Sequence, residues 1–434
     1  MFGLHVPPDV ARHLVGVGED AIASSVARTK TPVPSWLTRA TQQSPVQKRS
    51  TVAYLNVKKS LKLMAAIAPD PDVTSFIKAS GLQKLTHLSA VSGVAGEEMV
   101  SRVTVGVDGK REGFLAAAGD GQLKKEDLRS IPADAAAAIA LRINAGEAFD
   151  KIIETLMLIE PRAAREFESG FLEISRELQG YDVRRELLPA LGDVWTAHAT
   201  ANEGSLITGW LFRVAVKDRA AAERGMKQVL AQLEKVSERD KGRGRAGALQ
   251  KIVFAGEELY YLAIPDDDVP MVPTWCLRKN EFVFSLWPQA LKNYLSRKPA
   301  SKSLDAVSRV ANLFAADRLP TVVVYSDTRE LFKWAYPLTQ VGVNVALAEL
   351  RRSGIELDAS LLPSPGAIAP HLAPSVTALY LQDTGFYVDR RQSVPGISGV
   401  ALWVQGMMLY TLPLRNYRRQ IDFEQMIEEE EIPR

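Results

Sequence analysis

One order of elements recurs along this chain and limits the folds that it can adopt. A β-branched or apolar stretch, an amphipathic helical stretch and a pair of strands around a turn follow one another from residues 51, 135 and 320. Apolar alternation every second residue predicts strands, and an apolar repeat every three to four residues predicts helices, so the order indicates a mixed α and β protein. Sequence identity between the three copies is weak, and duplication is therefore an inference from element order alone.

The middle copy is the most complete. A strand is predicted over Ala135–Ile143, then two helices, then a hairpin of Val194–Ala199 and Leu206–Val216. Asp218 is suited to be the N-cap of a further helix, and Lys251–Phe254 follows as a strand. The order is βαββαβ with one inserted helix. We therefore predict an α+β fold of repeated strand–helix–hairpin modules, with ferredoxin-like sheets and helices on one face.

The inserted helix is predicted over Ala163–Gln179. Its apolar residues recur at offsets of 4, 7 and 11, which predicts one buried stripe; they are Phe167, Phe171, Ile174 and Leu178.

The predicted elements divide the chain into five parts, and 434 residues suffice for two or three domains. Residues 1–50 form an N-terminal arm. Modules follow over 51–134, 135–256 (the βαββαβ unit) and 257–395. Residues 396–434 hold an apolar segment with a basic and then an acidic tail.

Charge and cysteine content exclude several kinds of protein. Lys and Arg number 53 against 51 Asp and Glu, so no overall field favours binding to nucleic acid, and we expect no nucleic-acid partner. Cys276 is the single cysteine, which excludes an internal disulfide framework and a multi-cysteine metal site. It lies between Trp275 and Leu277 in an apolar strand, and we predict a buried structural thiol rather than a nucleophile.

Three short motifs have the residues of a chemical site without its context. Gly242–Gly247 spells G-x-G-x-x-G, but a helix precedes it and a strand follows, the reverse of a dinucleotide-binding turn. Ser75–Lys78 spells S-x-x-K without the companion K-T-G, and its Phe76 and Ile77 are predicted to be the buried side of a short helix. Asp266–Asp268 lacks the spacing of a calcium loop and is predicted to be a solvated turn.

The five histidines do not form a metal motif. They are His5, His13, His87, His198 and His371. His87 and His198 fall in hairpin strands of two modules, where a pair could meet across a sheet. No third ligand is evident, so we predict two half-exposed sheet residues.

The segment Ile397–Leu414 is 18 residues long without a charge and precedes Arg415, Arg418 and Arg419. That length is the lower limit for a membrane span, and the arginines would lie on the cytoplasmic side. Gln405, Thr411 and Pro413 fit a buried terminal element equally well. Membrane contact through Ile397–Leu414 and burial in the core both remain open.

Several short stretches resemble an uncharacterised family of paralogous planctomycete proteins that carry a domain of unknown function. They span roughly residues 35–395 and are Ile131–Asp134, Leu188–Trp195, Val214–Arg219, Pro273–Cys276, Trp287–Leu291, Leu362–Gly366 and His371–Ser375. The resemblance implies an exported, envelope or periplasmic protein, but it implies no activity. The start at Met1 has no basic, apolar signal peptide, so we expect a cytoplasmic protein if Met1 is the true N-terminus.

No catalytic residue, cofactor-binding residue or metal ligand can be assigned from these patterns, and we expect no cofactor. The favoured hypothesis is a non-catalytic, envelope-associated protein that binds or scaffolds an unknown protein or small ligand through its sheet faces. One alternative is a hydrolase with a site assembled from residues distant in sequence, and another is a small-ligand sensor. A deep pocket with convergent Asp, Glu, His or Ser groups would favour an enzyme, whereas a broad apolar or aromatic face would favour binding.

Overall fold

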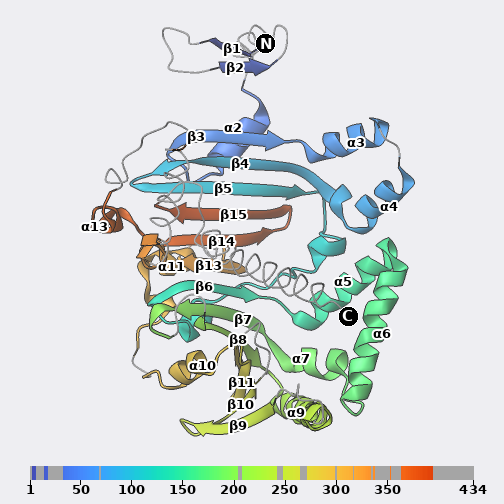
Figure 1. The fold of residues 1–434 in the computed structure, drawn as a ribbon. Coiled ribbons are helices and arrows are strands. Elements are labelled where there is room, and N and C mark those ends of the chain that lie inside the picture. Colours follow the sequence, from blue (N-terminus) through green and yellow to red (C-terminus); the bar gives the residue numbers. More distant parts are fainter. Residues whose placement is uncertain are drawn as a thin grey trace, which may run out of the picture.

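The computed structural model describes residues 33–67, 70–203, 208–241, 248–263, 271–298, 301–315, 317–333 and 363–393, with residues 336, 337 and 352 and two short strands near the N-terminus. Within these ranges helices are combined with one antiparallel sheet of 13 strands, and the α+β fold class is confirmed. Figure 1 shows the strands stacked from β3 to β9, with helices α3 to α6 in a column beside the stack, at one end of the strands.

The large sheet has the order β3–β4–β5–β15–β14–β13–β6–β7–β8–β12–β11–β10–β9. In chain order its strands are β3 (Lys48–Leu55), β4 (Leu85–Ala95), β5 (Glu98–Val107), β6 (Ala135–Arg142), β7 (Leu191–Thr200), β8 (Trp210–Val216), β9 (Ala248–Phe254), β10 (Glu257–Ala263), β11 (Thr274–Arg278), β12 (Glu281–Ser285), β13 (Val322–Ser326), β14 (Ser375–Gln382) and β15 (Gly385–Gln392). A separate pair is formed by β1 (Phe2–His5) and β2 (Leu14–Val17).

Most helices lie between strands. They are α2 (Ser35–Gln42), α3 (Val57–Ile67), α4 (Pro71–Ala79), α5 (Ala145–Ile159), α6 (Pro161–Glu177), α7 (Leu188–Ala190), α9 (Arg219–Lys241), α10 (Pro288–Leu295), α11 (Ser308–Ala311) and α13 (Pro365–Ile368). As predicted, Asp218 caps α9, because its carboxylate accepts a hydrogen bond of 3.0 Å from the amide of Ala221.

The hairpin of β7 and β8 is confirmed, but the ferredoxin-like order is not the order observed. In a split βαβ unit a single helix carries the chain back along the sheet, so the two strands that it joins are parallel. Here β6 and β7 are direct antiparallel neighbours. The reason is the inserted helix: α5 leads away from the end of β6 and α6 returns to it, so β7 starts where β6 stopped. Helices α3 and α4 have the same effect between β3 and β4.

A single sheet runs through all three predicted modules. Strand β15, from the third module, pairs with β5 of the first over the register Gly385–Gly106 to Gln392–Met99. Strand β13 joins the third module to β6 of the second. The sequence ranges 51–134, 135–256 and 257–395 therefore contribute neighbouring strands to one ladder.

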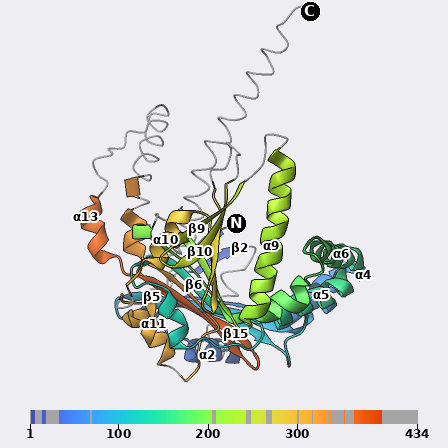
Figure 2. The same cartoon turned by 90° about the horizontal axis from the view of Figure 1, so that it is seen from below.

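One face of this sheet is packed against helices, and we call it the covered face. Trp36 of α2 stacks on Tyr54 of β3 with ring centroids 4.5 Å apart. Residues that are paired in the sheet point to the same face, so the face of Tyr54 can be followed from strand to strand to the residues that pack against α10 and α11. Figure 2 shows α2 and α11 together on one side of the strands. Helices α3 to α6 lie at the ends of the strands instead, so the expectation of helices on one face holds for α2, α10 and α11 but not for these four.

The main core lies on the covered face. Small side chains of β6 (Ala138 and Ala140) allow neighbouring turns to approach closely, and these turns contribute Leu128, Ile131 and Val310. A second cluster lies beneath α10 and consists of Leu211, Leu259, Cys276, Val283, Leu291, Tyr294 and Leu295.

Candidate functional site

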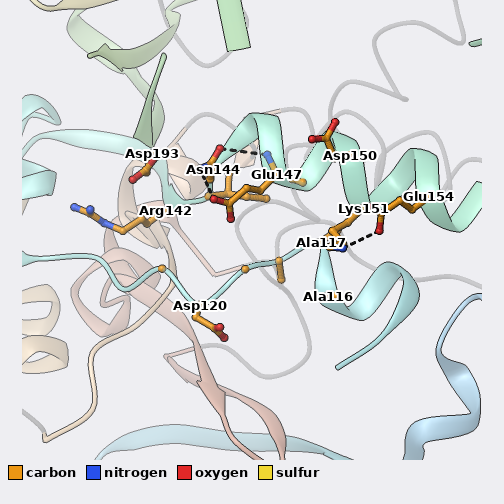
Figure 3. Close-up of a pocket in the computed structure, with 15 residues that line it drawn as sticks. Ala116, Ala117, Asp120, Arg142, Asn144, Glu147, Asp150, Lys151, Glu154 and Asp193 are labelled. Atoms are coloured by element: carbon orange, nitrogen blue, oxygen red, sulfur yellow. Dashed lines mark hydrogen bonds and ion pairs between the residues drawn. The ribbon is translucent and has the colours of Figure 1, made fainter. Parts of the chain in front are cut away.

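One polar site is a pocket of about 660 Å³ at the junction of β6 and α5. Asn144 is the N-cap of α5, and its side-chain oxygen accepts hydrogen bonds from the amides of Gly146 (3.1 Å) and Glu147 (3.3 Å). This cap places the first turns of α5 opposite residues 116–121, and Asp193 of β7 borders the pocket (Figure 3). The site therefore combines three segments that are distant in sequence.

Most charged groups of this pocket pair with a neighbour of opposite charge, whereas Glu147 accepts a hydrogen bond of 2.9 Å from the side-chain amide of Asn144. Arg142 pairs with Asp127 at 2.7 Å, Lys151 with Glu154 at 2.7 Å, and Asp193 with Lys217 at 2.6 Å. The hydrogen bond that Lys151 donates to Glu154 raises the pKa of Lys151 above its ordinary value. Among the residues that line the pocket, none is Ser, Thr, Tyr, His or Cys. The lining can accept hydrogen bonds from a polar ligand, but it presents no hydroxyl, thiol or imidazole side chain.

A different site lies on the face opposite to α2, α10 and α11, and we call it the open face with respect to these three helices. Strand register places Ile139 and Leu141 of β6 beside Trp195 of β7, and Trp195 beside Val214 of β8. Phe212 of β8 then lies beside Phe284 of β12, with ring centroids 6.0 Å apart. These side chains and Phe282 line a groove of about 400 Å³, which we call the aromatic groove.

The aromatic groove is apolar throughout. Thr196 and Arg213 also border it, but their side chains alternate to the covered face, so the side chains that face the groove are carbon-rich. The indole nitrogen of Trp195 donates a hydrogen bond of 3.3 Å to the carbonyl of Ile143 and is satisfied within the fold. Leu331 covers one end of the open face, near Ala137 and Ala199. Phe212 leaves 43% of its surface exposed.

Two ion pairs with little exposure lie on the covered face instead. Arg213 pairs with Glu281 beneath α10, and both side chains are less than one fifth exposed. Arg102 of β5 pairs with Asp389 of β15, again on the side that carries α2. An antiparallel sheet with one solvated face usually presents polar residues to water and apolar residues to the core. Across β6, β7, β8 and β12, the pair of Arg213 and Glu281 is on the helix-covered side and the aromatic side chains are on the open side. At the β9–β10 edge, Lys251 and Glu258 pair at 2.6 Å on the open side.

His198 lies within the polar part of the covered face. The prediction of a half-exposed residue is wrong for His198, which is 1% exposed, and right for His87, which is half-buried. Its Nε2 atom accepts a hydrogen bond of 3.0 Å from Arg297, which also pairs with Glu203. Burial, and then the charges of Arg297 and Arg213, lowers the pKa of His198 to about 3. The imidazole is therefore neutral, and its 3.9 Å approach to Glu203 is not an ion pair.

The two strand histidines do not meet. Six strand spacings separate β4, which holds His87, from β7, which holds His198, or roughly 29 Å at the usual spacing. Within the described ranges, no cluster of three or more His, Cys, Asp or Glu side chains is arranged to bind a metal ion.

The surroundings of the other candidate residues, Cys276, Ser75 and Lys78, do not form a catalytic site. Cys276 is fully buried, as predicted, and burial followed by the nearby carboxylates of Glu257 and Glu281 raises the pKa of its thiol to about 12. Ser75 and Lys78 are exposed on α4. Phe76 was predicted to be buried beside them but is 43% exposed, because α4 packs against the end of α5 rather than on the sheet.

Three predicted features lie outside the described residues. They are the glycine motif Gly242–Gly247, the aspartates Asp266–Asp268 and the apolar segment Ile397–Leu414. Among the helices that the structure describes, none is both long enough and apolar enough to cross a bilayer.

The sequence analysis missed the aromatic groove. The signal was the alternation of Trp210, Phe212 and Val214 in β8 and of Phe282 and Phe284 in β12, which places aromatic side chains on one face. No family model, curated protein or solved structure matches the chain. The resemblance to the planctomycete family therefore stays a prediction.

Proposed function

We propose that this chain is a non-catalytic binding protein that holds the hydrocarbon portion of a small ligand in the aromatic groove. The observation that carries the proposal is the reversed polarity of the sheet at β6, β7, β8 and β12, where the pair of Arg213 and Glu281 lies under α10 and the aromatic side chains lie on the open face. Large apolar patches on the surface of a soluble protein commonly mark sites of interaction. Evolution of a sheet for solubility alone would favour the opposite distribution.

The backbone around the groove favours a hydrocarbon over an extended peptide. Strands β6, β7, β8 and β12 each have a partner on both sides, so their amide and carbonyl groups are used in the ladder. An extended peptide laid across this face would leave its own backbone groups without partners, which is costly. A hydrocarbon chain has no such groups. The groove volume of about 400 Å³ is also within the range of small-ligand sites.

The runner-up function, a hydrolase, would use the polar pocket at the start of α5. Its carboxylates come from distant parts of the sequence, as that hypothesis requires, but Glu154 and Asp193 are engaged with neighbouring cations. The location in the cell envelope that the family resemblance implies is compatible with a hydrocarbon ligand, since acyl lipids are abundant there. We therefore retain envelope association as part of the proposal.

Titration of the full-length protein with a fluorescent fatty acid tests the proposal. We expect saturable binding, and we expect Phe212→Asp to weaken it at least tenfold, because a carboxylate in the groove would lose hydration when the chain binds. Leu158→Asp on α5 is the matched control, since Leu158 is 70% exposed and does not line the groove. Equal affinity of the Phe212→Asp and Leu158→Asp variants would refute the proposal.

A further inference from the structure

Helices α3 and α4 follow one another in the chain, and neither contains a buried residue. We call them the α3–α4 hairpin. Five large apolar side chains on it are more than 40% exposed, and they are Leu63, Met64, Ile67, Val73 and Phe76. A helical pair held together by its own packing would bury such residues. The pair instead projects from the end of β3 and β4, as Figure 1 shows.

The exposed surface of α3 has two chemically distinct faces. Lys58, Lys59 and Lys62 have the spacing i, i+1, i+4, and all three are exposed. The same spacing recurs five residues later in Leu63, Met64 and Ile67. Five residues correspond to a rotation of about 140° on an α-helix, so the basic and apolar faces are adjacent but separate. Val57 and Leu61 lie between them and are half-buried against the fold.

The charge of the hairpin is predominantly positive and largely unneutralised. Lys59, Lys62 and Lys78 form no ion pair with any residue that the structure describes. Lys58 approaches Asp108 at 3.2 Å, but both side chains are more than half exposed, so the pair is weak. The carboxylate of Asp70 is used as the N-cap of α4, where it accepts from the amide of Asp72 at 2.8 Å.

The apolar surface of the hairpin continues onto the open face of the sheet. Leu55 is two residues before α3, and its register partner on β4 is Leu88. Leu55 is 49% exposed and Leu88 is 37% exposed. Both side chains belong to the same face as the aromatic groove, but they lie on the edge strand β3 and its neighbour β4.

From these observations we propose that the α3–α4 hairpin docks on the surface of an anionic lipid bilayer. An interfacial helix buries an apolar face at the boundary between headgroups and acyl chains, and its flanking lysines contact anionic headgroups. The two faces of α3 match that arrangement. The lysine stems can also extend along the apolar surface while the ammonium groups stay in water. This contact goes beyond the proposed function, because ligand binding in the groove does not require it.

Flotation of the full-length protein with vesicles tests the inference. We would compare vesicles of phosphatidylcholine alone with vesicles that contain one quarter phosphatidylserine, at 0.15 M salt. We expect binding to the anionic vesicles and little to the neutral ones. The combined change Lys59→Gln, Lys62→Gln and Lys78→Gln should lower partitioning roughly a hundredfold, at about fivefold for each lysine. Soluble glycerophosphoserine should not compete, because it has no acyl boundary.

The apolar contribution is tested by Leu63→Asp with Ile67→Asp, against Leu158→Asp as the control. The first variant should lose vesicle binding while its thermal unfolding is unchanged, since both side chains are exposed. One result would overturn the inference: the lysine variant and the Leu63/Ile67 variant both bind vesicles normally, but Trp403→Asp does not bind. That result would assign the contact to Ile397–Leu414. Fatty-acid titration of the same variants distinguishes the two proposals, because changes in the hairpin should leave affinity in the groove intact.

Discussion

The ion pair between Arg297 and Glu203 makes a measurable contribution to stability. Arg297 donates hydrogen bonds to both carboxylate oxygens of Glu203 and a third, of 3.0 Å, to Nε2 of His198. The Arg297 side chain is 19% exposed and that of Glu203 is 10% exposed. Removal of one partner of a buried pair leaves the other charge without compensation. We expect Arg297→Met to cost about 3 kcal/mol, the lower end of the range for buried pairs, because part of the arginine contacts solvent.

Urea unfolding followed by tryptophan fluorescence measures this cost as a shift in midpoint at constant slope. Lys151→Met is the matched control, since the pair of Lys151 and Glu154 is about half exposed and should contribute less than about 0.5 kcal/mol. The double variant Arg297→Met with Glu203→Gln should be less destabilised than the sum of the single variants. An Arg297→Met variant as stable as Lys151→Met would refute the assignment of a buried pair.

Three further outcomes are expected. In the unfolded chain His198 takes up a proton below its ordinary pKa of about 6.5, whereas in the folded protein it does so only near pH 3. The free energy of unfolding should therefore fall as pH drops through 6.5, by about 2 kcal/mol at pH 5. A His198→Gln variant whose stability falls equally steeply would contradict this expectation. Gly385→Ala should cost at least ~2 kcal/mol by thermal unfolding, because φ is +139° and a Cβ atom would lie 2.0 Å from the carbonyl oxygen of Val105. Gly96→Ala, at φ +63° in open space, should cost about 1 kcal/mol, and equal costs would refute the steric explanation. Deletion of residues 397–434 should produce aggregation in size-exclusion chromatography if the apolar segment packs against the protein, whereas a monomeric truncation of full heat stability would contradict that expectation.

Element types were predictable from the sequence because strong local signals specify them. The β-branched run at β13, the apolar repeat of α5 and the Asp218 cap each act within a few residues. Strand order was not predictable in the same way. It depends on whether one helix or two connect a pair of strands. It also depends on the pairing of β15 with β5, in which Gly385 lies opposite Gly106, a residue 279 positions earlier in the chain, and no local sequence signal specifies that pairing.

The stripe on α6 shows why an amphipathic pattern does not by itself assign burial. The four predicted residues recur along one side of the helical stretch; they are Phe167, Phe171, Ile174 and Leu178. The rings of Phe171 and of Phe149 on α5 are in contact, with centroids 4.7 Å apart. Phe167 and Ile174 are nevertheless more than 40% exposed, so the predicted fully buried stripe is wrong. The helix packs on α5 at the end of the sheet, where one neighbour cannot cover the whole stripe.

The candidate site was hidden by the same ambiguity. In β8 the open face carries Phe212 and the covered face carries Arg213, whose charge is satisfied by Glu281 across the sheet. A rule that places charged residues outside would therefore orient this strand the wrong way round. The pairing of Arg213 with Glu281 depends on β12, which is 65 or more residues later in the chain and cannot be inferred from the strand itself.

Photoaffinity labelling tests the central claim most directly. A fatty acid with a diazirine near the middle of its chain would be irradiated with the full-length protein, and labelled peptides would be located by mass spectrometry. The account predicts that the label is concentrated on the strands of the aromatic groove, at Trp195, Phe212 and Phe284, and that unlabelled fatty acid competes for it. Label confined to the polar pocket around Glu147, or spread over the surface without competition, would contradict the claim that the open face is the binding site.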